Sequence, residues 1–302
     1  MPGLLPDVDP DGLLEYSVVY TDRALNHMAR RFQRVMQELS AGLKQAYGAR
    51  SAIVVPGSGS YGMEAVARQF ATGQPVLVVR NGWFSYRWSQ IFETGAITAA
   101  ATVCKARPAA PGAQAAFAPA PIAEVVDAIR TNRPAVVFAP HVETSAGMIL
   151  PDDYLRAVAD AVHAHGGLFV LDCVASGAMW VDMKATGVDI LISAPQKGWS
   201  STPCAGLVML GEQARARIDA TRSSSFSLDL KKWLAIMEAH EQGNAPYHAT
   251  LPTDGLAQLR DAVQETAAFG FDAARAAQQA IGAEVRALLE ASGIKSVAAP
   301  GF

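Results

Sequence analysis

Two ionisable side chains in the middle of the chain could act together chemically. Asp172 ends the apolar run 168–171, and Lys197 follows the apolar run 189–193 within the small and polar segment 193–201. A lysine at a strand end in a crevice can lose solvation, which lowers the pKa of its amine and frees it as a nucleophile. A buried carboxylate can pair with a buried cation, such as a protonated ring nitrogen. Taken singly, Asp172 would cap a turn and Lys197 would be a solvated surface residue.

A third segment suits a phosphate. Residues 57–62 read G-S-G-S-Y-G and lie between an apolar run and a helical pattern. Glycine lets the backbone approach a phosphate closely, and a helix N-terminus offers free N–H groups and a positive dipole. The hydroxyls of Ser58 and Ser60 suit one terminal phosphate monoester. The spacing is also typical of dinucleotide sites, although the acid expected about 20 residues later is missing. Because Arg80 could accept a 2′-phosphate there, an NADP-binding oxidoreductase stays open.

The elements that must position these segments follow an alternating pattern. Short apolar runs separated by amphipathic helical patterns predict a mostly parallel sheet with helices on both faces. The expected strands are residues 51–55, 76–79, 135–139, 168–171, 189–193 and 206–210. The expected helices are residues 22–46, 61–71, 85–94, 123–131, 152–165, 211–218 and a long stretch, 253–292, with Thr253 at its N-cap. The Ala- and Pro-rich residues 106–121 are expected to form a surface excursion.

Composition excludes several classes of protein. The 302 residues carry 25 Lys+Arg and 28 Asp+Glu, so the net charge of −3 offers no basic surface for nucleic acid or an anionic membrane. With half its residues hydrophobic, the chain is not disordered. No apolar run approaches the roughly 18 residues of a membrane span, and residues 1–10 do not resemble a signal peptide. Three distant cysteines fit a reducing compartment. We expect a cytoplasmic protein without nucleic-acid, membrane or metal partners.

Five unusual segments follow predicted strands, and the carboxyl ends of parallel strands are where open α/β sheets bind ligands. They are residues 57–62, 81–87, 141–147, 172–177 and 193–201. Their convergence would bring a phosphate cradle, a buried carboxylate and a lysine to one edge of the sheet. That set matches a Schiff-base site for pyridoxal 5′-phosphate (PLP).

Six segments carry a family resemblance. GSGSYGMEA, NGWFSYR, HVETSAG, LDCVASG, DILISAPQKG and YHAT occur in this order between about residue 50 and residue 255. In them the sequence resembles the class V, fold-type I PLP-dependent aminotransferases of the alanine–glyoxylate and serine–pyruvate group. The resemblance implies a mostly parallel central sheet with helices on both faces, followed by a small C-terminal domain that this chain only begins.

The resemblance carries family roles to matching positions. Lys197 matches the lysine that forms the Schiff base with PLP and then moves the proton of the substrate α-carbon, and Asp172 matches the acid that keeps the pyridine nitrogen protonated. The other matches are Ser58, Gly59 and Ser60 around the phosphate, Gln196 as a phosphate contact beside the lysine, Phe84 and Val174 on the two ring faces, Thr144 near the ring oxygen, and Tyr247 and Thr250 at the phosphate of the neighbouring subunit. Two positions depart or shift: Ser60 stands where relatives often carry His, and Trp83 is the alternative to Phe84 if the alignment moves by one.

The resemblance also implies an organisation. Residues 1–50 would form an N-terminal arm and helix, residues 51–255 the large PLP-binding domain, and residues 256–302 a long helix and the start of the small domain. Tyr247 and Thr250 imply a homodimer with two shared active sites. In the family, the small domain supplies the arginine that binds the substrate carboxylate, and this sequence ends at Phe302, just as that domain begins. Either the chain is a fragment of a longer enzyme, which is the favoured expectation, or this arginine has been lost or replaced.

The implied activity is transfer of an amino group from a small amino acid, of the alanine or serine type, to a 2-oxo acid such as glyoxylate or pyruvate. A PLP lyase or an aminophosphonate transaminase of the same fold is the main alternative, beside the NADP oxidoreductase and a non-catalytic PLP-binding dimer. Other residues are weaker candidates. His141 and Glu143 lack a third metal ligand, His163 and His165 are expected in solvent, and the buried packing residues are expected to include Trp88, Trp199 and Cys204.

Overall fold

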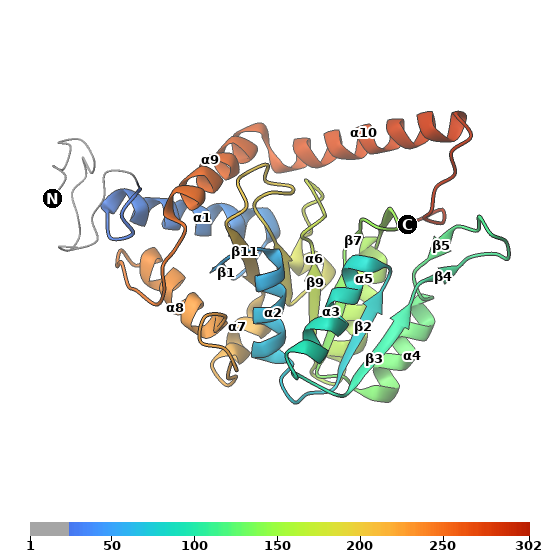
Figure 1. The fold of residues 1–302 in the computed structure, drawn as a ribbon, viewed down its shortest axis with the longest axis horizontal. Coiled ribbons are helices and arrows are strands. Elements are labelled where there is room, and N and C mark those ends of the chain that lie inside the picture. Colours follow the sequence, from blue (N-terminus) through green and yellow to red (C-terminus); the bar gives the residue numbers. More distant parts are fainter. Residues whose placement is uncertain (1–23) are drawn as a thin grey trace.

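The apolar runs form a central seven-stranded sheet in the computed structural model, which describes residues 24–302 (Figure 1). The spatial order is β1-β11-β10-β9-β6-β2-β3. The strands are β1 (Ser51–Pro56), β2 (Val76–Arg80), β3 (Ala101–Lys105), β6 (Val136–Pro140), β9 (Leu168–Asp172), β10 (Ile190–Ser193) and β11 (Ala205–Leu210). β11 pairs antiparallel with both neighbours, and the other pairs of the sheet are parallel. The predicted α/β class with a mostly parallel sheet is therefore confirmed.

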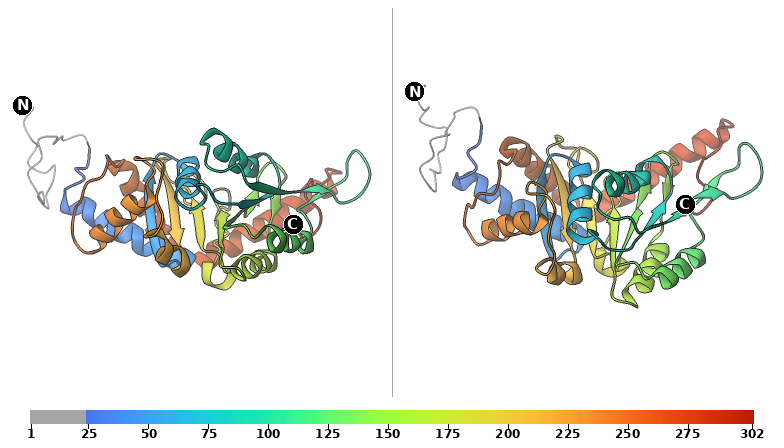
Figure 2. Two further views of the ribbon diagram at one scale, coloured as in Figure 1. Left: turned by 90° about the horizontal axis from the view of Figure 1, so that it is seen from below. Right: turned by 60° about the horizontal axis from the view of Figure 1, so that its bottom comes forward.

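Helices cover both faces of the sheet (Figure 2). On one face lie α2 (Gly59–Phe70) and α3 (Trp83–Thr94), and on the other lie α4 (Ile122–Asn132) and α5 (Asp152–His163). The end of the sheet at β1 is covered by α1 (Arg30–Tyr47) and α8 (Leu230–Glu241), and the remaining helices are α6 (Met183–Thr186), α7 (Glu212–Ile218), α9 (Thr253–Phe269) and α10 (Phe271–Ala291). α1 buries Phe32, Met36, Leu39 and Leu43, the one-sided spacing of a helix on a core.

The direction of the strands decides where the connecting segments lie. β1, β10, β9, β6, β2 and β3 run the same way, because β11 reverses direction relative to both β1 and β10. Their carboxyl ends therefore form one edge of the sheet, and the five segments expected to converge all begin at that edge. The expected convergence is confirmed as a matter of topology.

Two glycines let α2 lie directly on the sheet. A Cβ at Gly206 of β11 would lie 2.7 Å from the Ser58 carbonyl oxygen and 2.8 Å from the backbone nitrogen of Gly62. A Cβ at Gly62 would in turn lie 3.4 Å from the Cα of Gly206. The first turn of α2 is thus held against β11 backbone to backbone, which fixes the position of its N-terminus.

The long helical stretch near the end of the sequence is divided. Gly270 has φ +99°, a conformation that side-chain-bearing residues rarely adopt, and it separates α9 from α10. α10 then runs along the top of the molecule in Figure 1, across the carboxyl edge of the sheet. Gln278 of α10 accepts a hydrogen bond from the Ala178 N–H at 2.6 Å and donates to the Ser176 carbonyl at 3.2 Å. The prediction of one unbroken helix was wrong.

Other differences have local causes. β3 was not predicted, because it is an edge strand with exposed ends and little apolar signal. α6 and α8 were also missed. α1 begins at Arg30 instead of residue 22, and residues 22 and 23 lie outside the described part of the chain. Thr253 is the first residue of α9, and its N-cap is Pro252, so the N-cap prediction was wrong.

Two hairpins complete the fold: β4 (Arg107–Pro108) with β5 (Phe117–Ala118), and β7 (Val142–Glu143) with β8 (Met148–Ile149). The first belongs to the predicted surface excursion. Its Phe117 pairs with Ala298, so the end of the chain adds to this hairpin. Within residues 24–302, no helix combines the length and the apolar character that crossing a membrane requires.

The histidine at the end of α5 is tied into the opposite, amino edge of the sheet. His163 Nε2 lies 2.7 Å from Oδ2 of Asp189, which also accepts from the Phe169 N–H at 2.8 Å. The hydrogen bond to Asp189 raises the pKa of His163, burial opposes this, and Asp160 adds to it while Arg217 lowers it. The expectation that His163 sits in solvent was wrong. His165 is also held, with Nε2 2.8 Å from the Pro134 carbonyl.

We predict a pH-dependent loss of stability for His163→Gln. Because folding raises the pKa of His163, its stabilising contribution is complete below the pKa of the unfolded chain and is lost as the pH rises through the folded value. The variant should cost about 1–2 kcal/mol of unfolding free energy at pH 5.5 and less at pH 8.5, measured by urea denaturation. His165→Gln, which removes a bond to a carbonyl, is the matched control. An equal cost at both pH values for His163→Gln would contradict the prediction.

Candidate active site

Three of the converging segments meet at Gly59. A Cβ at this residue would lie 2.8 Å from Cγ2 of Val174 and 3.3 Å from Cβ of Ala194. Gly198 approaches the Gly177 backbone so closely that it has no room for a side chain. The segments that follow β1, β9 and β10 are therefore in van der Waals contact, and the residues predicted for the phosphate, one ring face and the lysine belong to one site.

The N-terminus of α2 is open. Ser58 is its N-cap with extended backbone (φ −152°, ψ 175°), and its side chain forms no capping hydrogen bond. Gly57 before it has φ +124°, and a Cβ there would lie 2.7 Å from the Tyr61 ring. The first N–H groups of a helix have no partner within the helix, and they attract anions. The predicted residues Ser58, Gly59 and Ser60 thus form a cradle that suits a phosphate.

The N-terminus of α3, at the same edge, is closed by the protein itself. The fully buried carboxylate of Glu143 accepts from the N–H groups of Phe84 (3.1 Å) and Ser85 (2.9 Å) and from the hydroxyls of Ser85 (2.7 Å) and Ser145 (2.6 Å). Burial alone would raise the pKa of Glu143, but these hydrogen bonds lower it overall. The Ser145 hydroxyl also accepts from the Trp83 N–H at 2.9 Å. An incoming anion therefore finds free N–H groups at α2 rather than at α3.

These contacts also argue against a metal pair or an acid–base dyad formed by His141 and Glu143. The Glu143 carboxylate caps α3. His141 Nδ1 lies 2.8 Å from the Ser176 hydroxyl, and burial, followed by the charge of Arg275, lowers the pKa of His141 to about 4. The two residues form neither a metal pair nor an acid–base dyad. The capping role of Glu143 was not predicted; the available signal was an acid three residues after the apolar run that forms β6.

Asp172 ends β9, level with Ile192 of β10, and is 9% exposed. Its Oδ1 accepts from the Val174 N–H at 3.0 Å. Burial raises the pKa of Asp172 to about 6, while the Val174 hydrogen bond and the charge of Arg87 lower it and the charge of Glu143 raises it. A carboxylate in this position gains from a cationic partner such as a pyridinium N–H.

Lys197 lies in the turn after β10, where its side chain is exposed. Among residues 24–302 that side chain has no hydrogen-bond or ion-pair partner, so its amine is available. The turn is held by the bonds from the Ser200 N–H to the Lys197 carbonyl (3.1 Å) and from the Ser201 N–H to the Pro195 carbonyl (3.0 Å). Beside the lysine, Oε1 of Gln196 is buried without a partner in the described structure. Such an orphaned acceptor is expected where a ligand donor is still to arrive.

Phe84 and Trp83 differ in their surroundings. Phe84 is 38% exposed, and the Arg87 guanidinium carbon lies 5.6 Å from the centre of its ring. Arg87 donates from Nη1 to the Ser60 hydroxyl at 3.1 Å, which links Phe84 to the cradle. The Trp83 ring, 66% exposed, instead lies near Tyr86 at 6.4 Å. The geometry favours Phe84 over Trp83 as the residue beside the cradle.

Three predicted residues lie apart from these contacts. Thr144 is exposed in the turn of the β7–β8 hairpin. Tyr247 (64% exposed) and Thr250 lie in the loop between α8 and α9, with their hydroxyls 3.4 Å apart, and they line a cavity of about 740 Å³ together with residues 24–28. Within residues 24–302, no hydrogen bond joins Tyr247 or Thr250 to the cradle of the same chain.

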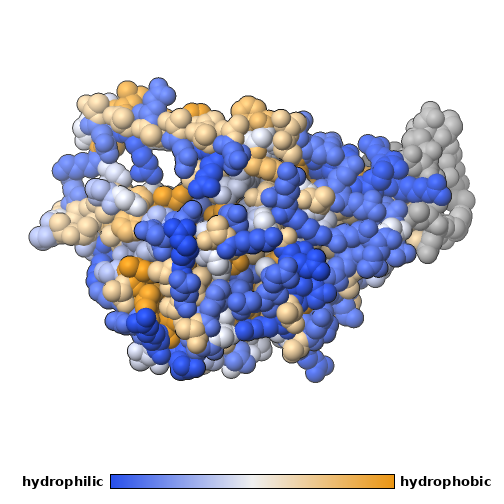
Figure 3. All heavy atoms as spheres, turned by 180° about the vertical axis from the view of Figure 1, so that it is seen from behind, coloured by the Kyte–Doolittle hydropathy of each residue, from blue (hydrophilic) through white to orange (hydrophobic). Residues whose placement is uncertain are grey.

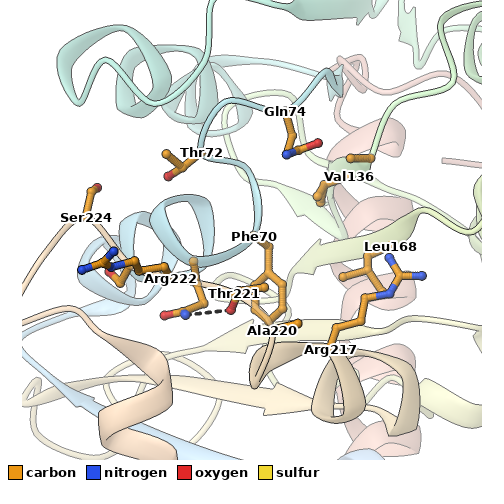
Figure 4. A pocket seen from close by; sticks show the side chains of 13 residues that line it. Phe70, Thr72, Gln74, Val136, Leu168, Arg217, Ala220, Thr221, Arg222 and Ser224 are labelled. Carbon is orange, nitrogen blue, oxygen red and sulfur yellow. Dashed lines mark hydrogen bonds between the residues drawn. The ribbon is translucent and has the colours of Figure 1, made fainter.

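The predicted packing residues are confirmed: Trp88 and Trp199 are buried at 0% and 1% exposure and Cys204 at 9%. A cavity of about 650 Å³ lies at the amino edge of the sheet, on the far side from Lys197, beside Phe70, Val136 and Leu168 (Figure 4). It contains none of the predicted site residues.

The sheet topology argues against a dinucleotide site. A dinucleotide fingerprint needs the strand before the glycines and the strand after the helix to be parallel partners in one βαβ unit. Here β1 pairs antiparallel with β11, and four strands separate β1 from β2 in the sheet. Arg80 stacks over the Tyr86 ring at 5.0 Å and donates to the Ser89 hydroxyl at 3.3 Å, away from the α2 cradle.

The fold is that of the fold-type I PLP-dependent transferases. The sequence matches the family described as aminotransferase class-V over residues 13–300, and the chain belongs to this family. Membership implies PLP as the cofactor. The open α2 N-terminus, the Phe84 ring beside Arg87 and Ser60, and the buried Asp172 carboxylate fit its phosphate, ring and pyridinium nitrogen.

The chain is similar in sequence and fold to several aminotransferases, and the match covers only part of their length. The chain is 26% identical over 244 residues to the alanine–glyoxylate aminotransferase of Oryctolagus cuniculus and 31% identical over 243 residues to a 2-aminoethylphosphonate–pyruvate transaminase of Paraburkholderia xenovorans, covering 79% of this chain in each case. It spans 59% and 61% of the length of those relatives. The structure of an alanine–glyoxylate aminotransferase from Nostoc sp. has a TM-score of 0.75 at 24% identity, covering 88% of this chain and 68% of that one.

Asp172→Asn should stabilise the cofactor-free protein at alkaline pH. Because burial raises the Asp172 pKa from 3.8 to about 6, the folded protein keeps this proton in a range where the unfolded chain has lost it. The unfolding free energy of the wild type therefore falls between pH 4 and pH 6, and the neutral variant should be about 1–3 kcal/mol more stable than the wild type at pH 8.

Urea denaturation at pH 4.5 and pH 8 measures this difference. Asp229→Asn is the matched control, because Asp229 caps α8 and asparagine caps equally well. Lower stability of Asp172→Asn at pH 8 would show that the carboxylate is stabilised by partners other than an incoming cation.

Proposed function

We propose that the protein is a PLP-dependent aminotransferase that moves an amino group from a small amino acid, of the alanine or serine type, to a 2-oxo acid such as glyoxylate or pyruvate. One observation carries the proposal: the open N-terminus of α2, the buried Asp172 and the unpaired Lys197 lie at one sheet edge in a chain of the class-V family. A single cofactor with a phosphate, a ring nitrogen and an aldehyde satisfies all three.

The proposed roles follow from these positions. PLP, when bound, supplies an aldehyde carbon that bonds to amines and a ring that withdraws electrons from the substrate α-carbon. Ser58, Gly59 and Ser60 would bind the phosphate, with Gln196 beside them. Asp172 would hold the proton of the ring nitrogen, because an anionic carboxylate this buried is stabilised by a cation.

Lys197 would carry the covalent bond to the aldehyde carbon. The same amine would take up and return the proton of the substrate α-carbon, a general acid–base step. Phe84 and Val174 would hold the ring between them, and Thr144 would reach the ring oxygen. Thr144 is exposed in the β7–β8 turn, and within residues 24–302 no hydrogen bond joins it to Ser58, Gly59 or Ser60. Its proposed contact is therefore with the cofactor ring alone.

Lys197→Ala should abolish the reaction cycle. The wild type supplied with PLP should show the visible absorption band of a lysine-bound cofactor, lose it on addition of L-alanine or L-serine, and regain it with glyoxylate. The variant should show neither change and should turn over amino donor about 10²–10⁴-fold more slowly. Lys184→Ala, which removes an exposed lysine of α6, is the matched control and should behave as the wild type.

The spectra decide between the alternatives. Turnover by Lys197→Ala at the wild-type rate would refute the role of Lys197. A band that responds to 2-aminoethylphosphonate and not to alanine or serine would assign the aminophosphonate alternative. A band that responds to no donor would indicate a PLP-binding protein without transamination, and no band at all would refute PLP binding.

We further propose a homodimer in which Tyr247 and Thr250 reach the phosphate in the partner's site. Their side chains are exposed and face each other, and neither contacts the cradle of its own chain within the described residues. An isologous interface would bring each pair to the other protomer and make two equivalent shared sites.

Subunit mixing tests this arrangement. Lys197→Ala and the double variant Tyr247→Ala/Thr250→Ala should each be inactive or weakened, and a re-equilibrated equimolar mixture should regain about a quarter of wild-type activity, because half of the dimers are mixed and one of their two sites is intact. A mixture that never exceeds the mean of its components would show that each pair serves its own chain. Sedimentation of the mixture checks that dimers are present.

A further inference from the structure

The guanidinium of Arg87 lies at the mouth of the α2 cradle. Arg87 belongs to the first turns of α3. Its guanidinium carbon lies 5.6 Å from the centre of the Phe84 ring, and its Nη1 donates to the Ser60 hydroxyl at 3.1 Å. Its charge also reaches Asp172, whose pKa it lowers. Arg87 is therefore in contact with two residues of the proposed site and electrostatically coupled to a third, although the sequence analysis gave it no role.

The charge of Arg87 is not neutralised by a neighbour. The side chain is half-buried, and no carboxylate between residues 24 and 302 forms an ion pair with it within 4 Å. Glu143 of β7, which lies against the start of α3, accepts hydrogen bonds from the Phe84 and Ser85 N–H groups instead. Asp172 influences Arg87 only through space, without a hydrogen bond. A half-buried arginine beside an open helix N-terminus is a site for an anion that is still to bind.

The donors left at this point match a phosphate. Arg87 forms one hydrogen bond through Nη1, which leaves the rest of its five N–H donors free. Paired N–H donors of a guanidinium fit two oxygens of a phosphate, and a charged donor binds a dianion more strongly than a hydroxyl does. Ser60 itself offers only a neutral hydroxyl, and the guanidinium that holds it supplies the positive charge that the cradle lacks.

We propose that Arg87 is a phosphate-binding residue of the cofactor site. Among residues 57–62 and 81–87, it is the one side chain with a positive charge. This inference rests on the proposed PLP function. Arg87 does not act on the reacting carbon; it binds the phosphate. Through its contacts with Ser60 and Phe84 it also holds the starts of α2 and α3 in place relative to each other.

The test compares two ligands that differ only in the phosphate. Dissociation constants of PLP and of pyridoxal are measured by equilibrium dialysis in the Lys197→Ala background, where no covalent bond to that lysine contributes. Arg87→Gln, which keeps hydrogen-bonding capacity and loses the charge, should weaken PLP binding about 10- to 100-fold and pyridoxal binding less than about threefold. Arg87→Lys should keep most of the preference for PLP.

Arg80→Gln is the matched control. Arg80 also contacts an aromatic ring and a serine hydroxyl, those of Tyr86 and Ser89, but it does not touch the cradle. Its loss should leave the ratio of the two dissociation constants unchanged. Equal weakening of PLP and pyridoxal by Arg87→Gln would overturn the proposal and make Arg87 a residue that positions Phe84. No weakening of either ligand would overturn it as well.

Inorganic phosphate separates this inference from the proposed function. If the protein with Arg87 intact binds neither PLP nor pyridoxal, the proposed function fails. Phosphate should nevertheless raise the thermal unfolding midpoint of the wild type and not that of Arg87→Gln, which would retain Arg87 as an anion-binding residue. Equal shifts in both proteins would overturn the inference about Arg87 independently of any result with PLP.

Discussion

The common direction of six strands is the constraint on which the site depends. Because β1, β2, β6, β9 and β10 end at one edge, residues more than 130 positions apart in sequence, from Ser58 to Lys197, are brought together without any long loop. β11 runs the other way, and its Gly206 lets the first turn of α2 lie directly against it. The sheet thus fixes where a helix dipole, a carboxylate and an amine point, while the segments between strands supply the chemistry.

Charge is distributed unevenly along this edge, and the distribution gives the site its polarity. Glu143 neutralises the start of α3, so the open N–H groups remain at α2. Asp172 is destabilised by burial, and Arg87 has no ion-pair partner in the described chain; the two opposite charges influence each other without a hydrogen bond between them. A ligand with a cationic ring nitrogen and an anionic phosphate would satisfy both. Burial of Asp172 costs the ligand-free protein stability, and loss of stability of this kind is common at binding sites.

α10 adds a second level of organisation. It crosses the carboxyl edge of the sheet, where Gln278 is hydrogen-bonded to the backbone of Ala178 and Ser176. Phe271 at its start packs edge-on against Trp180 and Trp199, with ring centres 5.9 and 6.3 Å apart. No residue of α10 is buried, and its apolar side chains Ile281, Val285, Leu288 and Leu289 remain 41–67% exposed (Figure 3 shows apolar residues gathered along the top of the molecule). The helix is therefore anchored by Gln278 and by its first turn, and beneath it Gly198 lies so close to the Gly177 backbone that it has no room for a side chain.

The sequence by itself determined the fold class, six of the seven central strands to within one residue at every end, the edge of the sheet at which the candidate segments lie, and the candidate residues at Ser58, Asp172 and Lys197. It could do so because buried parallel strands are continuous apolar runs, and because a glycine-rich turn or an isolated lysine after such a run is conspicuous. It could not determine β3, the break at Gly270, or the surroundings of His163, since these depend on edge exposure, backbone conformation and contacts between distant residues. Only the tertiary structure decided that Glu143 closes α3 and leaves α2 open, and that Arg87 reaches Ser60, because both are hydrogen bonds across elements that no local spacing encodes.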